Sequence, residues 1–173
     1  MSDPNTQPDH FEIYKLTLPL VGAMLSILGG FAAVFIRARL EKKQEIEYIK
    51  IGLKDELYEI CSIIDHLTET YTRTQVLSNT YLNNLSKNTE AFTQYKQRLF
   101  LINNETLRRQ IVAFYKKLNE VISESVNKVG TLGENPSGAE HEKIVSKFTS
   151  IATEARTIGS DLDKYKYRLL WLV

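Results

Sequence analysis

The chain has 173 residues, of which 22 are basic and 21 acidic, so its formal net charge at pH 7 is +1. This length accommodates one domain with a short appendage, and the near-neutral charge creates no field that would attract nucleic acid, so no nucleic-acid partner is expected. A single cysteine, Cys61, excludes an intramolecular disulfide, so packing must hold the fold together.

The first predicted element is an apolar helix over residues 16–36, a stretch of 21 residues without an ionisable side chain. At 1.5 Å per residue it covers about 30 Å, the hydrocarbon thickness of a bilayer. Pro19 lies in the first turn, where a missing N–H costs little. The alternatives are a buried core helix, which is unusual at this length in a small protein, and a cleaved signal peptide, which needs a basic leader and a shorter apolar run. The pattern therefore favours a single transmembrane helix.

Basic residues follow this helix and are nearly absent before it. Four Lys and Arg residues lie between positions 37 and 43, whereas Lys15 is the only one upstream. By the positive-inside rule, residues 1–15 form a short extracytoplasmic tail and residues 37–173 lie in the cytoplasm. The predicted location is the cell membrane, as a single-pass protein with its N-terminus outside.

Small residues recur along the predicted span at intervals of four, at Gly22, Ser26 and Gly30. They share one helix face, and small side chains at this spacing let helix backbones approach closely in lipid. The alternative is that apolar spans are simply rich in glycine and alanine. The stripe predicts self-association of the span, and therefore a homo-oligomer in the lipid bilayer.

A long amphipathic helix is predicted directly after the span, because no helix breaker intervenes. Its apolar residues step by three or four from Ile46 to Tyr71, which defines one buried face. Gly52 is a weak point in this helix, worth about 1 kcal/mol relative to alanine. Cys61 lies on the helix with the strongest apolar face, so we expect a packed thiol.

The polar stretch over residues 72–88 predicts a turn near Ser78, because its Asn, Ser and Thr side chains compete for backbone hydrogen bonds. A second helix is expected over residues 92–102. The asparagine pair at 103–104, followed by a glutamate, is typical of a helix end and the cap of the next helix.

A third helix is predicted up to about Gly130, and the glycine-rich stretch 130–138 is the clearest loop. The last helix has apolar residues that alternate by four and three from Ile144 to Leu172. Such a seam suits a parallel coiled coil between chains, but similar seams and short connections make antiparallel packing within one chain simpler. The sequence predicts an all-α fold, with one N-terminal transmembrane helix continuing into a cytoplasmic antiparallel bundle of three to four long helices.

The end of the chain mixes basic and aromatic side chains. If the bundle has four helices, this end returns to the membrane surface. Lys166, Arg168 and Trp171 are then expected to contact the membrane interface. The alternative is that the tryptophan completes the core while the basic side chains face solvent.

No residue pattern predicts a catalytic, cofactor-binding or metal site. Asp65, His66 and Glu69 lie within one turn, but no further ligand completes a metal set, so an exposed histidine beside acids is the better interpretation. His141 is expected in a loop. Basic and aromatic residues over 108–117 share their helix with glutamates, which favours a salt-bridged face. We expect no enzymatic activity, no cofactor and no bound metal.

The leading hypothesis is a membrane-anchored interaction protein, whose span tethers it while its bundle recruits or senses an unidentified protein partner at the inner membrane face. The second is an oligomeric membrane-perturbing or pore-forming effector regulated by the cytoplasmic bundle. Few polar side chains lie in the span beyond Thr17 and Ser26, which disfavours a water-filled pore but not disruption after rearrangement. A membrane-bound enzyme would need a partner to supply its active site.

Overall fold

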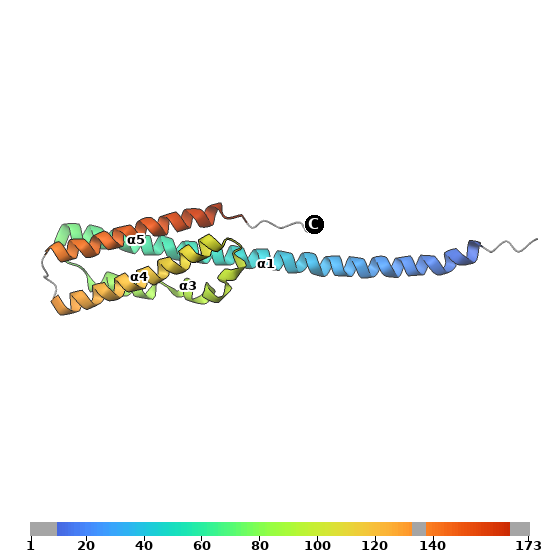
Figure 1. Cartoon of the computed structure of the whole chain (residues 1–173), viewed down its shortest axis with the longest axis horizontal. Helices are drawn as coiled ribbons and strands as arrows, with labels where there is room; N and C mark the ends of the chain where they lie inside the picture. The colour runs from blue at the N-terminus through green and yellow to red at the C-terminus, as the bar shows by residue number, and fades with distance from the viewer. Residues whose placement is uncertain (1–9, 133–137, 167–173) are drawn as a thin grey trace, which may run out of the picture. The chain divides into compact units, whose positions relative to one another are not determined.

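The computed structural model describes residues 10–132 and 138–166, with side chains in 18–128 and 138–166 (Figure 1). All regular structure in these ranges is helical, which confirms the all-α prediction. The elements are α1 (His10–Thr74), α2 (Asn79–Lys87), α3 (Glu90–Tyr95), the 3-10 helix η1 (Lys96–Leu101), α4 (Glu105–Leu132) and α5 (Gly138–Lys164). The chain divides into two units, Met1–Lys43 and Gln44–Val173, and α1 contributes to both.

The described part of the first unit is the N-terminal stretch of α1. Pro19 lies inside this helix without ending it. Every side chain from Leu18 to Ala38 is exposed, and eleven of these are large and apolar. Within the described chain, α1 is the one helix whose length and composition would allow it to cross a membrane.

In the second unit, one face of α1 forms the centre of the core. The residues that the spacing predicted to be buried are all buried: Ile46, Ile49, Leu53, Leu57, Ile60, Ile64, Leu67 and Tyr71. Their regular steps of three and four place them on one side of the helix, where the other helices of this unit cover them. This prediction is confirmed.

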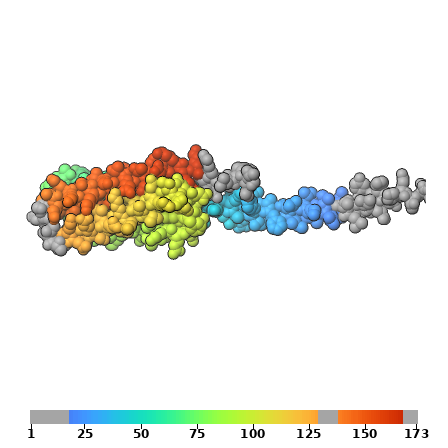
Figure 2. Space-filling model, in the orientation of Figure 1, coloured from blue at the N-terminus to red at the C-terminus, as the bar shows by residue number. Residues whose placement is uncertain are grey.

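Contacts between helices fix their directions in the second unit. The ammonium group of Lys54 donates to Asp163 at 2.7 Å, and the thiol of Cys61 donates to the carbonyl of Ala152 at 3.5 Å. As the residue numbers rise along α1, the numbers of the residues that they contact in α5 fall, so the two helices are antiparallel. Helices α4 and α5 also lie side by side in opposite directions (Figures 1 and 2). The thiol is packed in the core, as expected.

Three short elements, α2, α3 and η1, return along α1 in place of the expected second long helix over residues 92–102. The turn before them is confirmed near its predicted position, because α1 ends at Thr74 and Gln75 has a left-handed backbone with φ of 58°. Much of the polar stretch after it is helical rather than a turn, since Leu82 and Leu85 of α2 are buried. Burial of two leucines on one face compensates for the weak helix propensity of their polar neighbours.

The start of α4 agrees with the expected cap. The side-chain oxygen of Asn104 accepts the backbone N–H of Leu107 at 3.1 Å. Residues 133–137, within the predicted loop, lie outside the described residues. The apolar seam of α5 is buried within the chain from Ile144 to Leu162, and the remainder of the predicted seam lies mostly outside the described residues.

Candidate functional site

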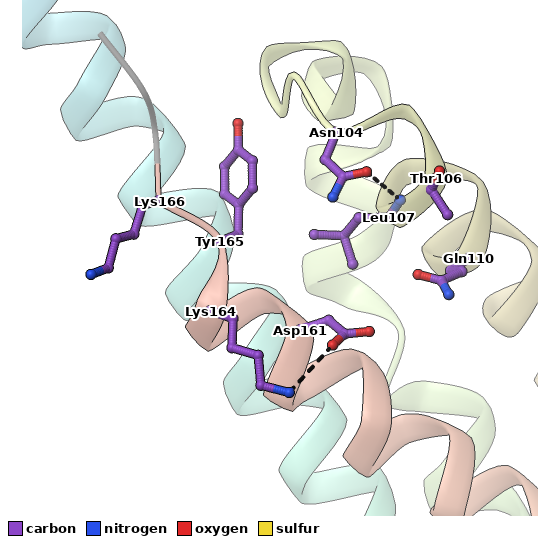
Figure 3. Close-up of a pocket in the computed structure, with 8 residues that line it drawn as sticks. All are labelled: Asn104, Thr106, Leu107, Gln110, Asp161, Lys164, Tyr165 and Lys166. Carbon is purple, nitrogen blue, oxygen red and sulfur yellow. Dashed lines mark hydrogen bonds and ion pairs between the residues drawn. The ribbon is translucent and has the colours of Figure 1, made fainter.

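A groove opens at the end of the second unit where α4 begins and α5 ends (Figure 3). Its volume is about 540 Å³. Mostly polar and charged residues line it, with one leucine and one tyrosine between them: Asn104, Thr106, Leu107, Gln110, Asp161, Lys164, Tyr165 and Lys166. Ligand sites are concave and use a few placed polar groups to fix orientation, so this hollow is the candidate binding site, although it is more polar than most small-molecule pockets.

The wall formed by α4 is fixed by the helix cap. Asn104 is held by its bond to Leu107, whose side chain is buried at the base of this wall. Thr106 and Gln110 lie one turn apart on α4, and both are exposed (Figure 3). The wall therefore offers amide and hydroxyl groups on a rigid helical backbone.

The opposite wall is the last turn of α5. The hydroxyl of Tyr165 accepts the backbone N–H of Asn103 at 2.9 Å, which joins the end of α5 to the start of α4. Lys164 and Asp161 form a loose ion pair of 3.8 Å. Lys166 follows them and is exposed. The groove thus combines two cations with one carboxylate, so its chemistry suits a polar ligand that carries charge.

The groove lies at the end of the second unit where α1 enters it. Lys54 of α1 is bonded to Asp163 beside the groove, and this hydrogen bond raises the pKa of Lys54. Arg98 of η1 pairs with Glu45, in the first turn of α1 within this unit. The end of α5 therefore returns to the first residues of the unit.

The structure describes one residue of the predicted membrane-interface set. Lys166 is exposed and lines the groove, whereas Arg168 and Trp171 lie outside the described residues. In the predicted self-association stripe, a Cβ atom added at Gly22 or Gly30 would meet none of the described residues within 4 Å. Neither glycine is therefore needed for packing against the described part of this chain.

The interpretation of residues 65–69 as a solvated helix face agrees with the structure. Asp65 accepts two hydrogen bonds from Arg156, and His66 is exposed. The expectation that His141 lies in a loop is wrong, because α5 begins at Gly138 and buries the imidazole edge-on against Tyr71. In the described residues, no group of three or more His, Cys, Asp or Glu side chains could hold a metal ion.

The basic and aromatic stretch of α4 is an ordinary helix surface over a core. Phe114 and Tyr115 are buried and contact each other edge-to-face, so neither is available to stack on a base. Lys117 pairs with Glu154, and Arg109 pairs with Glu105 one turn before it. These contacts support the expected salt-bridged face.

Sequence reasoning missed most of the groove, because its walls are far apart in the chain. Thr106, Gln110 and Asp161 carry no motif, and each is typical of an exposed helical position. Two signals were available: the cap at Asn104, which marked the start of α4, and Lys166, which was predicted at the membrane interface. Neither indicated that these two residues lie in one groove. No protein-family model, curated protein or solved structure matches the chain.

Proposed function

We propose that this protein is anchored in the cell membrane by one span of α1 and uses a cytoplasmic helical bundle to bind another protein at the inner membrane face. The exposed apolar surface of α1 carries this proposal, with eleven large apolar side chains between Leu18 and Ile36. Exposing these groups to water would cost on the order of 20 kcal/mol, which exceeds the stability of an ordinary domain. A bilayer removes this cost.

The residues after the apolar stretch support the proposed orientation. The segment directly after the apolar stretch is cationic, with Arg37, Arg39 and the lysines at 42–43. The positive-inside rule predicts that such a segment lies in the cytoplasm. The guanidinium of Arg39 lies over the ring of Phe35 at 4.2 Å from its centroid. An arginine beside an aromatic ring is well suited to the boundary between lipid and water.

The directions of the helices support a bundle of four alternating segments. Helices α1 and α4 run away from the entry of α1 into the second unit, while the short elements and α5 return toward it. The groove beside Lys164 and Lys166 then belongs to the membrane-proximal end of the bundle. We infer that this end contacts head groups and a protein partner through polar and charged groups.

Self-association is part of the proposal. None of the described residues would contact a Cβ atom at Gly22 or Gly30, which leaves room for a second helix to approach the backbone at these positions. A dimeric or larger assembly would present several grooves side by side. Partner binding would then gain from multivalency without any new contact.

Topology mapping with single cysteines tests the anchor and its orientation. In a Cys61→Ser background, Ser2→Cys and Ser123→Cys are treated with a membrane-impermeant maleimide in intact and permeabilised cells. We expect Ser2→Cys to react in intact cells and Ser123→Cys to react only after permeabilisation. Release of the chain by alkaline carbonate would contradict the membrane anchor, and the reverse labelling pattern would contradict the orientation.

A further inference from the structure

The segment from Asn88 to Leu101, here called the strap, contains α3 and η1 and runs antiparallel to α1. Polar contacts to three glutamates on one side of α1 hold it there. At the start of the strap, Asn88 Nδ2 donates to Glu59 Oε1 at 3.1 Å. In the middle, Glu56 accepts the N–H of Ala91 at 2.6 Å and the N–H of Phe92 at 3.2 Å. Near the end, Arg98 Nη1 donates to Glu45 Oε1 at 3.0 Å.

Glu56 acts as the N-terminal cap of α3 from a different helix. The residue before α3, Thr89, makes no side-chain capping hydrogen bond. The two oxygens of Glu56 instead accept the N–H groups of Ala91 and Phe92 in the first turn. The first turn of a helix has unpaired N–H groups and a positive partial charge, so a carboxylate is a favourable partner there.

Gly52 provides room for the strap one turn before Glu56. A Cβ atom at this position would lie 2.7 Å from Cε2 of Tyr95, which is closer than such contacts occur. The glycine that weakens α1 as a helix is therefore the position where a ring of the strap contacts the α1 backbone.

An aromatic contact joins the strap to α4. The ring of Phe92 stacks on that of Tyr115 with centroids 4.0 Å apart and planes 8° from parallel. The hydroxyl of Tyr115 is buried without a hydrogen-bond partner of ordinary geometry among the described residues. Burial, followed by the nearby Glu56 carboxylate, raises the pKa of Tyr115. Keeping the Glu56 carboxyl and the Tyr115 hydroxyl out of water has a desolvation cost, which offsets part of the stabilisation from the two hydrogen bonds that Glu56 accepts from the strap.

Helix α5 is held differently. Its buried face is a continuous series of apolar residues from Ile144 to Leu162. The strap contributes three buried side chains to the core, Phe92, Leu99 and Leu101, and the partly buried ring of Tyr95 packs against it. A segment with few buried apolar side chains and mainly polar attachments is expected to open at a lower free energy than the helices around it.

We propose that the strap opens from α1 as a local unit while α1, α4 and α5 stay packed, and that Glu56 is the residue that holds it closed. Opening uncovers the α1 backbone at Gly52 and one face of Tyr115, so the fold contains a closed state and an open state with different surfaces. This inference does not depend on the membrane anchor.

Hydrogen exchange measured by mass spectrometry on the full chain in detergent tests the strap. In Glu56→Ala, the amides of residues 90–101 should exchange on the order of tenfold faster, because the first turn of α3 loses its cap. Peptides from α4 and α5 should exchange as in the wild type. Glu56→Gln keeps an acceptor oxygen and should show a smaller change, and Glu69→Ala, an exposed glutamate elsewhere on α1, should show none.

A second readout is limited proteolysis with trypsin, since Lys96 and Arg98 lie in the strap. Glu56→Ala should be cut first at these two positions, and Gly52→Ala should open the same segment with Glu56 intact. Wild-type exchange of residues 90–101 in Glu56→Ala would overturn the proposal. Simultaneous loss of protection in the strap, α4 and α5 would also overturn it, because the strap would then not open independently.

Discussion

The carboxylate of Glu56 in α1 accepts the backbone N–H of Ala91 at 2.6 Å, although the two residues are 35 positions apart in the chain. A buried charge in one helix thereby completes the hydrogen bonding of another. Desolvation by burial raises the pKa of this carboxyl above its ordinary value of 4.5, against the hydrogen bonds that lower it. The protonated acid is therefore easier to bury than the carboxylate.

This shift predicts how the stability of the second unit depends on pH. When the pKa of a carboxyl is higher in the folded chain than in the unfolded chain, protonation stabilises the fold. This contribution is complete at a pH below the pKa of the unfolded chain, and it is lost as pH rises through the pKa of the folded chain. We expect the unfolding free energy of the wild type, minus that of Glu56→Gln, to grow as pH falls from 7 to 4.5. Urea titrations followed by circular dichroism measure it, and a difference that is constant with pH would contradict the prediction.

Glu124 should show the opposite dependence. Hydrogen bonds from Lys147 and then from Lys128 lower its pKa to about 2. When folding lowers the pKa of a carboxyl, its contribution to stability is present at a pH above the pKa of the unfolded chain, here 4.5. The contribution is lost as pH falls through the pKa of the folded chain. The wild type should therefore lose its advantage over Glu124→Gln between about pH 5 and pH 2. Glu120→Gln, whose partner Lys116 is 3.8 Å away, is the control and should change less.

Removing a ring from the core of α5 should destabilise the second unit strongly. Phe148 has no exposed surface, so Phe148→Ala should lower the free energy of unfolding by about 3 to 5 kcal/mol through lost burial and a new cavity. Thr149→Ala changes the exposed neighbour and should alter it by less than about 0.5 kcal/mol. Equal effects of the two substitutions in urea unfolding would show that the proposed core is wrong.

The proposed self-association of α1 should be lost when the small residues of its predicted stripe are enlarged. We expect the triple variant Gly22→Leu, Ser26→Leu and Gly30→Leu to be monomeric in detergent, while the wild type is a defined oligomer. Light scattering coupled to size-exclusion chromatography gives both masses. Met24→Leu combined with Leu28→Ile changes the opposite helix face and should leave the mass unchanged. A monomeric wild type would leave α1 as a simple anchor.

The proposed protein partner should contact the groove from one side of α4. A photoreactive phenylalanine analogue at Gln110 should give a cross-linked product in cell membranes, whereas the same group at Asn119, exposed elsewhere on α4, should not. Charge reversal by Lys164→Glu and Lys166→Glu should remove the product. Equal cross-linking from both positions, or a product that survives the charge reversal, would contradict a partner site in the groove.

Local periodicity predicted the parts of this fold that depend on burial of one helix face. The apolar steps from Ile46 to Tyr71 and from Ile144 to Leu162 correspond to buried faces, because a helix that packs on a core must repeat its apolar residues every three or four positions. The cap at Asn104 was predictable for a similar reason, since the N–H groups that it serves are its close neighbours in sequence.

Contacts between distant residues could not be read in this way. Residues 92–102 have helical spacing, yet they form α3 and η1 with a cap supplied from α1. Glu56 resembles any solvated glutamate in sequence, and its burial depends on the strap above it. The groove likewise joins Asn104 to Asp161 across two helices. Neither residue type nor spacing carries information about such neighbours.

The pairing of α1 with α5 has a consequence for how the chain is made. A ribosome adds about 5 to 20 residues per second, so several seconds or more separate the synthesis of Cys61 from that of Ala152, the residue it contacts. During this interval the apolar face of α1 lacks its final cover while the nascent chain is still attached. Helices α4 and α5 meet through local contacts soon after they emerge, but closure of the unit waits for α5. The exposed α1 face is therefore the surface that chaperones would shield during translation.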